Sequence, residues 1–153
     1  MTANEPAEVV EAFYRALRSR DVPRLLSVIA PDVEVSLAER LPAGWGGLHQ
    51  GRDSLLQTWA AMASEIVDLS PYPTDVVPHG DDMVIVVGAY IGRSRDDRPF
   101  SADFAHVVRV RDGHILRLRQ ITDTAAWHTA VGPLPERGSE APESEVGSWA
   151  SVE

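Results

Sequence analysis

The chain has 153 residues, a length typical of one domain, and 44% of them are hydrophobic, which is enough to build a core. It has no cysteine, which excludes disulfide bonds, thiolate metal ligands and catalysis by a cysteine nucleophile. The net charge of −9 argues against nucleic acid and membranes as partners, because both require a basic surface. No apolar run approaches the ~20 residues that span a bilayer, and the acidic, polar N-terminus is unlike a secretory signal, so we expect a cytoplasmic protein.

The first half of the sequence predicts three helices. Pro6 suits the opening turn of the first helix, whose apolar residues follow the helical period. These residues are Val10, Phe13, Tyr14 and Leu17. Asp21 is placed to cap a second, short helix that ends at Pro31. Alternation then predicts a strand over residues 33–37, a glycine- and proline-rich loop follows over about 41–51, and a third helix carries periodic apolar residues between 55 and 66.

The second half predicts a sheet. Three prolines within residues 70–78 allow only an edge or irregular strand there. Residues 83–91 read as a continuous apolar strand, residues 100–111 alternate, and a strong hairpin turn leads into a return strand over 115–122. A short helix over about 124–131 completes the domain. Helices first and a curved antiparallel sheet afterwards indicate an α+β architecture, with a cavity at the wide end of the sheet.

The last part of the chain differs in composition. From Gly132 onward, Pro, Gly, Ser and five glutamates dominate, with a single arginine. Such a segment cannot bury enough apolar surface to fold. We therefore predict a folded domain over 1–131 and a disordered acidic tail over 132–153.

Five strings of residues resemble a known family in their order and spacing. They are Val-Glu-Ala-Phe-Tyr-Arg-Ala-Leu from Val10, Ala-Pro-Asp-Val-Glu-Val from Ala30, His-Gln-Gly-Arg-Asp-Ser-Leu from His49, Phe-Ala-His-Val-Val-Arg-Val-Arg-Asp-Gly-His-Ile from Phe104 and Arg-Gln-Ile-Thr-Asp-Thr-Ala from Arg119. Over roughly residues 8–131 the chain resembles the SnoaL-like polyketide cyclases of the nuclear-transport-factor-2-like superfamily. The resemblance implies a cone-shaped α+β fold, in which a curved antiparallel sheet wraps around three N-terminal helices and encloses an apolar pocket.

The superfamily contains cyclases, isomerases, epoxide hydrolases and binding domains, so the fold does not define the reaction. The catalytic pattern of the ketosteroid isomerases matches Leu37, Phe13 and His106 here, so the base is missing. Limonene epoxide hydrolases need an Arg-x-Asp pair on the strand where residues 84–91 carry no charge. The acid/base aspartate of SnoaL-like cyclases is matched by Asp123.

Four residues are candidates for catalysis. At the floor of an apolar pocket, Asp123 would have a raised pKa suited to acid/base work, but it could equally cap the last helix. His106, which should point inward, could donate to a carbonyl or relay a proton, or be a structural histidine. Tyr90 could donate to an oxyanion or epoxide oxygen, or be a core tyrosine. Glu136 would act only if the tail folds back over the opening, and a solvated position is the alternative.

Other residues are candidates for substrate binding through apolar surface or, for the glutamine, by orienting a substrate oxygen. They are Trp45, Trp59, Phe13, Tyr14, Phe104 and Gln120. The five histidines form no i, i+4 pair and no H-x-H, so we expect no metal. The chain has neither a phosphate-binding loop nor a nucleophile elbow, and no cofactor is expected.

Three functions are consistent with these residues. The first is a cofactor-independent cyclase or isomerase of secondary metabolism, acting on a small apolar, oxygenated substrate of polyketide or epoxide type by general acid/base catalysis. The second is an epoxide hydrolase, and the third is a binding module without catalysis. Similar proteins often form homodimers through the outer face of the sheet. That face should carry Arg109, Arg111, Arg117 and Arg119.

Overall fold

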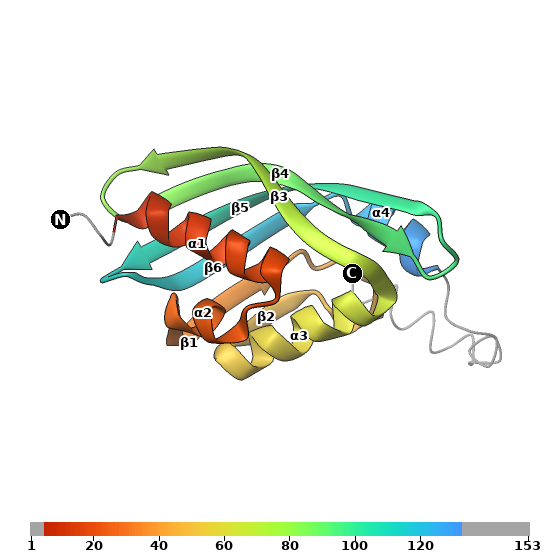
Figure 1. The fold of residues 1–153 in the computed structure, drawn as a ribbon, viewed down its shortest axis with the longest axis horizontal. Coiled ribbons are helices and arrows are strands. Elements are labelled where there is room, and N and C mark those ends of the chain that lie inside the picture. Colours follow the sequence, from red (N-terminus) through yellow and green to blue (C-terminus); the bar gives the residue numbers. More distant parts are fainter. Residues whose placement is uncertain (1–4, 133–153) are drawn as a thin grey trace.

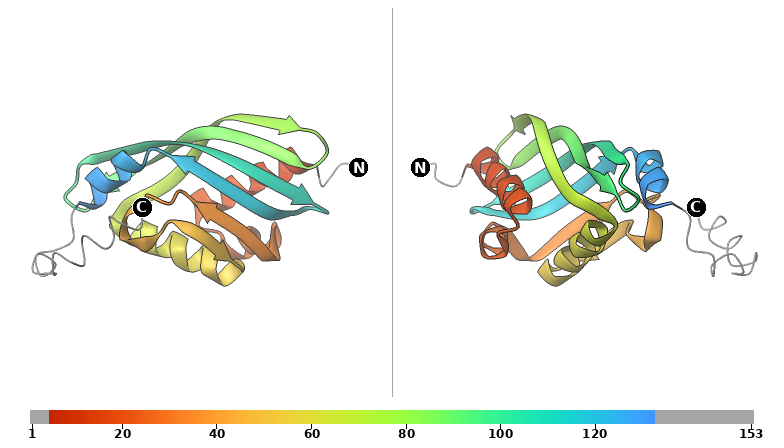
Figure 2. Two further views of the ribbon diagram at one scale, coloured as in Figure 1. Left: turned by 180° about the vertical axis from the view of Figure 1, so that it is seen from behind. Right: turned by 45° about the vertical axis from the view of Figure 1, so that its right-hand side comes forward.

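Helices pack on the concave side of a strongly curved sheet in the computed structural model, which describes residues 5–132 (Figures 1 and 2). Apart from Gly132, the predicted tail lies outside the described residues, and so does Glu136. The elements in chain order are α1 (Pro6–Ser19), α2 (Val22–Ser27), β1 (Ile29–Leu37), the 3-10 turn η1 (Pro42–Gly44), β2 (Gly47–Gln50), α3 (Arg52–Glu65), β3 (Ile66–His79), β4 (Met83–Ser94), β5 (Pro99–Arg111), β6 (His114–Thr122) and α4 (Thr124–Val131).

Helix α1 forms where the apolar period predicts it. Pro6 occupies its first turn, and Arg20 ends it in the left-handed region, where its backbone N–H donates to the carbonyls of Ala16 and Leu17. The predicted apolar face is buried along its length. Asp21 caps α2 as predicted, because its carboxylate accepts a hydrogen bond from the backbone N–H of Arg24. The short turn between the two helices directs the chain into β1.

The sheet is mixed rather than wholly antiparallel, which corrects the prediction. Within residues 5–132 it has six strands in the order β2-β1-β6-β5-β4-β3. The pairs on either side of β1 differ: β2 is antiparallel to it, whereas β6 is parallel to it, with Val35 opposite Leu118. A parallel pair needs a long connection, and here the connection is most of the domain, including α3 and the strands β3 to β5.

Strand β3 is an edge strand, as its prolines predict. It bends along β4, and its register shifts between Pro73 and Asp75. Gly88 of β4 makes the bend possible. A Cβ at this position would meet the carbonyl oxygen of Tyr72 and the Cα of Pro73, so a larger residue could not allow β3 to approach so closely. The bend contributes to the curvature of the sheet around the helices.

The core fills the space between the concave face of the sheet and the helices. Strand β5 alternates almost perfectly, and its inward residues include Phe104, His106 and Val108. Helices α1 and α3 cover this face, while α4 lies at one end of the sheet (Figure 2). Trp127 of α4 is fully buried and packs in T-shaped contacts against Trp45 and Phe100. None of the helices between residues 5 and 132 has the length and apolar character that crossing a membrane requires.

Candidate functional site

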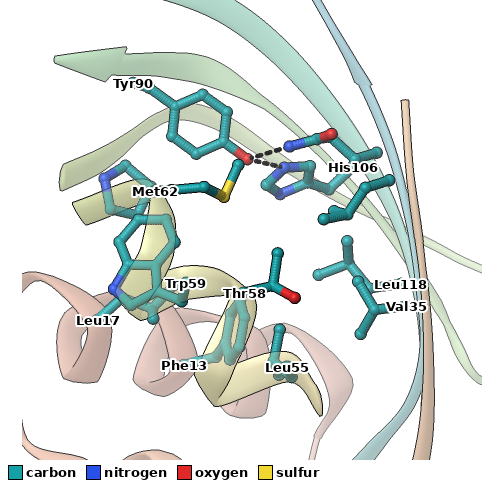
Figure 3. Close-up of a pocket in the computed structure, with 13 residues that line it drawn as sticks. Phe13, Leu17, Val35, Leu55, Thr58, Trp59, Met62, Tyr90, His106 and Leu118 are labelled. Carbon is teal, nitrogen blue, oxygen red and sulfur yellow. Dashed lines mark hydrogen bonds between the residues drawn. The ribbon is translucent and has the colours of Figure 1, made fainter. Parts of the chain in front are cut away.

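An apolar pocket lies between the concave face of the sheet and helices α1 and α3 (Figure 3). Its volume is about 50 Å³, which a few water molecules would fill. Tyr90 and His106 meet on one side of the pocket, and the side chains of α3 form the opposite side. The pocket is lined by Phe13, Leu17, Val35, Leu37, Leu55, Thr58, Trp59, Met62, Pro71, Tyr90, His106, Leu118 and Gln120.

A chain of buried hydrogen bonds runs along one wall of this pocket. The backbone N–H of Ala38 donates to Oε1 of Gln120 at 3.0 Å, and Nε2 of Gln120 donates to the hydroxyl of Tyr90 at 2.9 Å. The Tyr90 hydroxyl lies 2.7 Å from Nε2 of His106. On the other side of the imidazole, Nδ1 lies 2.5 Å from the hydroxyl of Tyr14. Strands β6, β4 and β5 and helix α1 therefore each contribute one side chain to a continuous chain of hydrogen bonds, which begins at the backbone N–H of Ala38.

Aromatic rings hold the imidazole of His106 in its plane. Phe104 stacks on it with ring centroids 4.1 Å apart and an interplanar angle of 15°. Tyr14 lies nearly parallel to it at 5.7 Å. Tyr90 tilts against Phe104 at 4.7 Å. The position of each polar atom in the chain is thus fixed by packing as well as by hydrogen bonds.

Burial keeps every member of this chain neutral near pH 7. Desolvation lowers the pKa of His106 to about 3. Desolvation also raises the pKa of Tyr90, against a smaller lowering by the hydrogen bond from Gln120. The pKa of Tyr14 is raised by burial and, to a smaller extent, by the nearby Tyr90. His106 is therefore a neutral donor and acceptor of hydrogen bonds rather than a base.

The pKa of His106 makes stability depend on pH in mildly acidic solution. In the unfolded chain a histidine takes up a proton below about pH 6.5, whereas the native His106 stays neutral down to about pH 3. Because the unfolded state binds more protons in this window, the free energy of unfolding should fall as pH falls. We expect a loss of about 3 kcal/mol between pH 7 and pH 4. Urea denaturation at a series of pH values measures it.

The matched control for this prediction is His106→Gln, which keeps a polar side chain but cannot titrate. Its absolute stability is expected to be lower, but its pH dependence between 7 and 4 should be shallower than that of the wild type by about the same 3 kcal/mol. Equal slopes for the two proteins would show that His106 is accessible to protons in the native state.

The structure places Asp123 outside the pocket. Its side chain is exposed and accepts a hydrogen bond from the backbone N–H of Ala126 at 3.3 Å, so that it caps α4. This placement corrects the expectation of a carboxylate on the pocket floor and matches the capping alternative. The residues Thr-Ala-Ala-Trp directly after Asp123 form the first turn of α4. Because the side chains of a strand alternate, a bulge would be needed to turn the carboxylate of Asp123 inward, and β6 has none next to it.

The predicted binding residues fall into three places in the structure. Phe13, Trp59 and Gln120 line the pocket, as expected. Phe104 and Tyr14 lie behind the wall and contact His106. Trp45 is buried, with its ring 6.1 Å from that of Trp127, and it does not line the pocket, which corrects its prediction as a substrate-binding residue.

Sequence reasoning missed the polar part of helix α3. Thr58 lines the pocket, and its hydroxyl lies 3.4 Å from Nδ1 of His49. The other ring nitrogen of His49 lies 2.7 Å from the carbonyl oxygen of Trp45. Because a carbonyl only accepts, a neutral His49 carries its hydrogen on Nε2 and leaves Nδ1 as an acceptor. Ser54 is a second hydroxyl near Nδ1, at 3.3 Å.

The spacing of α3 could have revealed Thr58. It follows Leu55 by three residues and precedes Met62 by four, so all three share the face that lines the pocket. Its partner His49 stands on β2, within the segment that the sequence predicted to be a loop. Among the described residues, no three His, Cys, Asp or Glu side chains come together in a way that could hold a metal ion.

The fold and the pocket together define an α+β domain of the cone-shaped, nuclear-transport-factor-2-like kind. A family model described as "SnoaL-like domain" matches residues 10–118, and the chain belongs to this family. No curated protein matches the sequence.

Several solved structures share the fold. TerC, crystallised with polyporic acid, is 30% identical with a TM-score of 0.76, over 82% of this chain and 98% of that chain. Two structures of IdmH, a proposed polyketide cyclase from Streptomyces antibioticus, are 26% and 24% identical. Their TM-scores are 0.71 and 0.73, over 83% and 84% of this chain and 99% of each. An NTF2-like protein of unknown function from Burkholderia pseudomallei is 24% identical with a TM-score of 0.77, over 84% of this chain and 98% of that chain.

Proposed function

We propose that this protein is a cofactor-independent cyclase or isomerase of secondary metabolism. It binds a small, apolar, oxygenated molecule of polyketide or epoxide type in the pocket and promotes closure of a ring. The observation that carries this proposal is the neutral, buried chain through Tyr90 and His106, which meets an otherwise apolar pocket. The similarity to TerC, crystallised with polyporic acid, and to IdmH, a proposed polyketide cyclase, supports the substrate class.

Tyr90 supplies the hydrogen-bond donor. Ring closure by an aldol-type step develops negative charge on a carbonyl oxygen, and opening of an epoxide develops it on the epoxide oxygen. A fixed hydroxyl in a pocket with little water stabilises that charge more than water does, because it needs no reorganisation. The apolar walls, with Phe13 and Trp59, would hold the chain of the substrate in a conformation that brings its ends together.

Thr58 and His49 supply the proton acceptor on the other side. The substrate loses a proton from an acidic carbon or from its attacking hydroxyl. That proton passes to Oγ1 of Thr58, while the hydrogen of Thr58 passes to Nδ1 of His49. Nδ1 can accept it because the hydrogen of the imidazole is on Nε2, which donates to the carbonyl oxygen of Trp45. The electron pair stays on the substrate and forms the new bond. His49 does not line the pocket, so it returns its proton to Oγ1 of Thr58, and the hydrogen of Thr58 passes to the alkoxide of the cyclised product. Asp123 has no part in this scheme because it lies outside the pocket.

The pocket must widen to admit such a substrate. Binding sites for drug-sized molecules measure about 300–1,000 Å³, well above the 50 Å³ of this pocket. Leu55 and Trp59 on α3 are only half-buried, whereas Phe13 and Leu17 on α1 are buried. We therefore expect α3 to move outward on binding while α1 and the sheet stay in place.

The test is a substrate panel. The protein is incubated with an acyclic triketone and with a hydroxy-epoxide, and cyclic products are separated by chromatography and weighed by mass spectrometry. Faster formation of a product of unchanged mass supports cyclisation. Addition of one water instead supports an epoxide hydrolase. Binding without any product supports the module without catalysis, which is favoured by the lack of a carboxylate among the described residues that line the pocket.

Thr58→Val tests the proton acceptor, because valine has nearly the shape of threonine but cannot pass on a proton. We expect ring closure to slow roughly 100-fold, at the low end of general-base effects, with little change in substrate affinity. Ser54→Ala is the control, since Ser54 contacts the same nitrogen of His49 but does not line the pocket. An equal loss in both variants would mean that His49 is only structural.

We also propose that two copies of the chain pair through the outer face of the sheet. Val87, Ala105 and Ile121 lie side by side across β4, β5 and β6, and Val87 and Ile121 are 43% and 51% exposed. The same face carries arginines and exposed aspartates, including Asp103 and Arg119, so two copies can offer each other opposite charges. Light scattering during gel filtration should give twice the mass of the chain.

Ile121→Arg is expected to halve that mass, because it replaces the most exposed residue of the apolar row with a charge. Val22→Arg is the control: this residue is also exposed, but on α2, away from the sheet. A dimer that survives Ile121→Arg and dissociates in Val22→Arg would place the interface elsewhere.

A further inference from the structure

The chain from Tyr14 through His106 to Tyr90 contains more hydrogens than it uses. Tyr14 and Tyr90 each carry one hydroxyl hydrogen, and a neutral imidazole carries one N–H. Only two hydrogen bonds join the three groups, Tyr14 to Nδ1 and Tyr90 to Nε2. One hydroxyl hydrogen is therefore left over, and it belongs either to Tyr14 or to Tyr90.

Gln120 fixes the role of the Tyr90 oxygen. Its Oε1 accepts from the backbone N–H of Ala38, which can only donate, so its amide nitrogen faces Tyr90. The Tyr90 oxygen therefore accepts a hydrogen bond from Gln120 in every arrangement of the chain. What remains open is the direction of the bond between Tyr90 and His106.

Two arrangements satisfy every contact. In the first, Tyr90 donates to Nε2 of His106, Nδ1 donates to Tyr14, and the hydrogen of Tyr14 is left over. In the second, Tyr14 donates to Nδ1, Nε2 donates to Tyr90, and the hydrogen of Tyr90 is left over. Tyr90 lines the pocket and Tyr14 does not. Only the second arrangement therefore offers a donor to a molecule in the pocket.

We propose that Tyr14, although it does not touch the pocket, is a specificity-determining residue that sets whether Tyr90 donates or accepts. A ligand with a ketone, ester or epoxide oxygen selects the arrangement with the hydrogen of His106 on Nε2. A ligand hydroxyl instead donates a hydrogen bond to the oxygen of Tyr90 and selects the arrangement with the hydrogen of His106 on Nδ1. The proposal rests on the proposed function in one respect, that the ligand occupies this pocket.

The neutral state of His106 supports this mechanism. A protonated imidazole would donate from both nitrogens and would leave no choice between the arrangements. Burial holds the pKa of His106 far below neutral pH. The stacked ring of Phe104 keeps the imidazole in place, so the two arrangements have the same heavy-atom positions and differ only in where the hydrogens lie.

Two conservative variants should lock opposite arrangements. In Tyr14→Phe, a hydrogen on Nδ1 would have no partner, so the hydrogen should sit on Nε2 and Tyr90 should donate permanently. In Tyr90→Phe, the hydrogen should sit on Nδ1 and point at Tyr14. A buried N–H without a partner costs more than a bare lone pair, which is why each variant has a preferred tautomer.

The experiment measures the ring-nitrogen chemical shifts of His106 at pH 7 in protein labelled with ¹⁵N-histidine, with His106→Gln to assign the signals. The probe is cyclohexanone, and its control is methylenecyclohexane, which has the same shape but no acceptor. We expect the Nε2–H tautomer in the ketone complex and in Tyr14→Phe, and the Nδ1–H tautomer in Tyr90→Phe. A ketone complex in the Nδ1–H tautomer, or two variants with the same tautomer, would overturn the proposal.

Failure of the proposed function gives a different result. If neither probe changes the methyl signals of Leu55 and Leu118, which line the pocket, the pocket does not bind such molecules. The opposite tautomers of the two variants would then still support the arrangement of hydrogens. Conversely, both probes could bind while His106 keeps the same tautomer in the wild type and in both variants. That result would support the pocket as a binding site and contradict the proposed role of Tyr14.

Discussion

Tyr90→Phe is expected to slow ring closure by about 100- to 1,000-fold, the effect of removing one donor from an oxyanion site. The variant loses the only hydrogen that the hydrogen-bonded group of Tyr14, His106 and Tyr90 can present to a substrate oxygen in the pocket. It keeps the ring, and with it the contacts to Phe104 and Trp127 at 4.7 and 5.3 Å. The affinity for substrate should change much less than the rate, because the hydrogen bond strengthens as charge develops on the oxygen. Single-turnover rates and substrate titrations separate the two effects.

The matched control is Tyr72→Phe. Tyr72 lies on β3, is 48% exposed and does not line the pocket. The rate of ring closure by Tyr72→Phe should equal that of the wild type within a factor of about two, which is far less than the effect of removing a donor from an oxyanion site. If Tyr90→Phe retained the full rate while Thr58→Val lost it, the oxygen would be stabilised by a group other than Tyr90, and the assignment of the donor would be wrong.

Trp127→Ala is expected to lower the free energy of unfolding by about 3–5 kcal/mol. Trp127 is fully buried at the end of the sheet, with ring contacts to Phe100 at 4.9 Å and to Trp45 at 6.1 Å. Its indole N–H donates to the hydroxyl of Thr122, which in turn donates to the carbonyl oxygen of Asp103 on β5. Alanine would leave a cavity between rigid aromatic rings, which cannot collapse to fill it. Urea denaturation followed by far-UV circular dichroism measures the loss.

Trp127→Phe should recover more than half of this loss, because it fills most of the space and forfeits only one hydrogen bond. Leu48→Ala is the exposed control, since Leu48 is 62% exposed and its truncation should change stability by less than about 0.5 kcal/mol. If Trp127→Ala lowered the free energy of unfolding by less than about 1 kcal/mol, α4 would be peripheral to the core. The packing of Trp45 would then not depend on Trp127.

The sequence predicted most elements because their patterns are local. The helical period of α1, the three prolines of an edge strand and the Asp-Gly turn before β6 all describe interactions within a few residues. Strand β2 was missed because it has only four residues, begins with a glycine and takes its extended form by pairing with β1. Strand β1 starts at Ile29 rather than at Val33 because Ile29 pairs with Ile115, at the far end of the chain.

The site was less predictable because its members depend on partners distant in sequence. The inward direction of His106 and Gln120 follows from strand alternation, so both were found. The pairing of His106 with Tyr14 crosses 92 positions, and no local pattern announces it. The sequence left the two placements of Asp123 open because a cap and a catalytic carboxylate have the same local sequence, and the structure shows the cap. Thr58 was missed because the helical spacing that puts it on the face of Leu55 and Met62 does not by itself distinguish a functional threonine from a structural one.

The parallel pair of β1 and β6 has a consequence for how the chain acquires its structure. The first strand cannot take its place in the sheet until the last strand has been made, since β6 lies between β1 and β5. Contacts between such distant segments close large loops and slow folding. During synthesis the N-terminal helices and β1 would leave the ribosome with their apolar faces uncovered. Factors that shield nascent chains should therefore influence the yield of this protein more than its stability once folded.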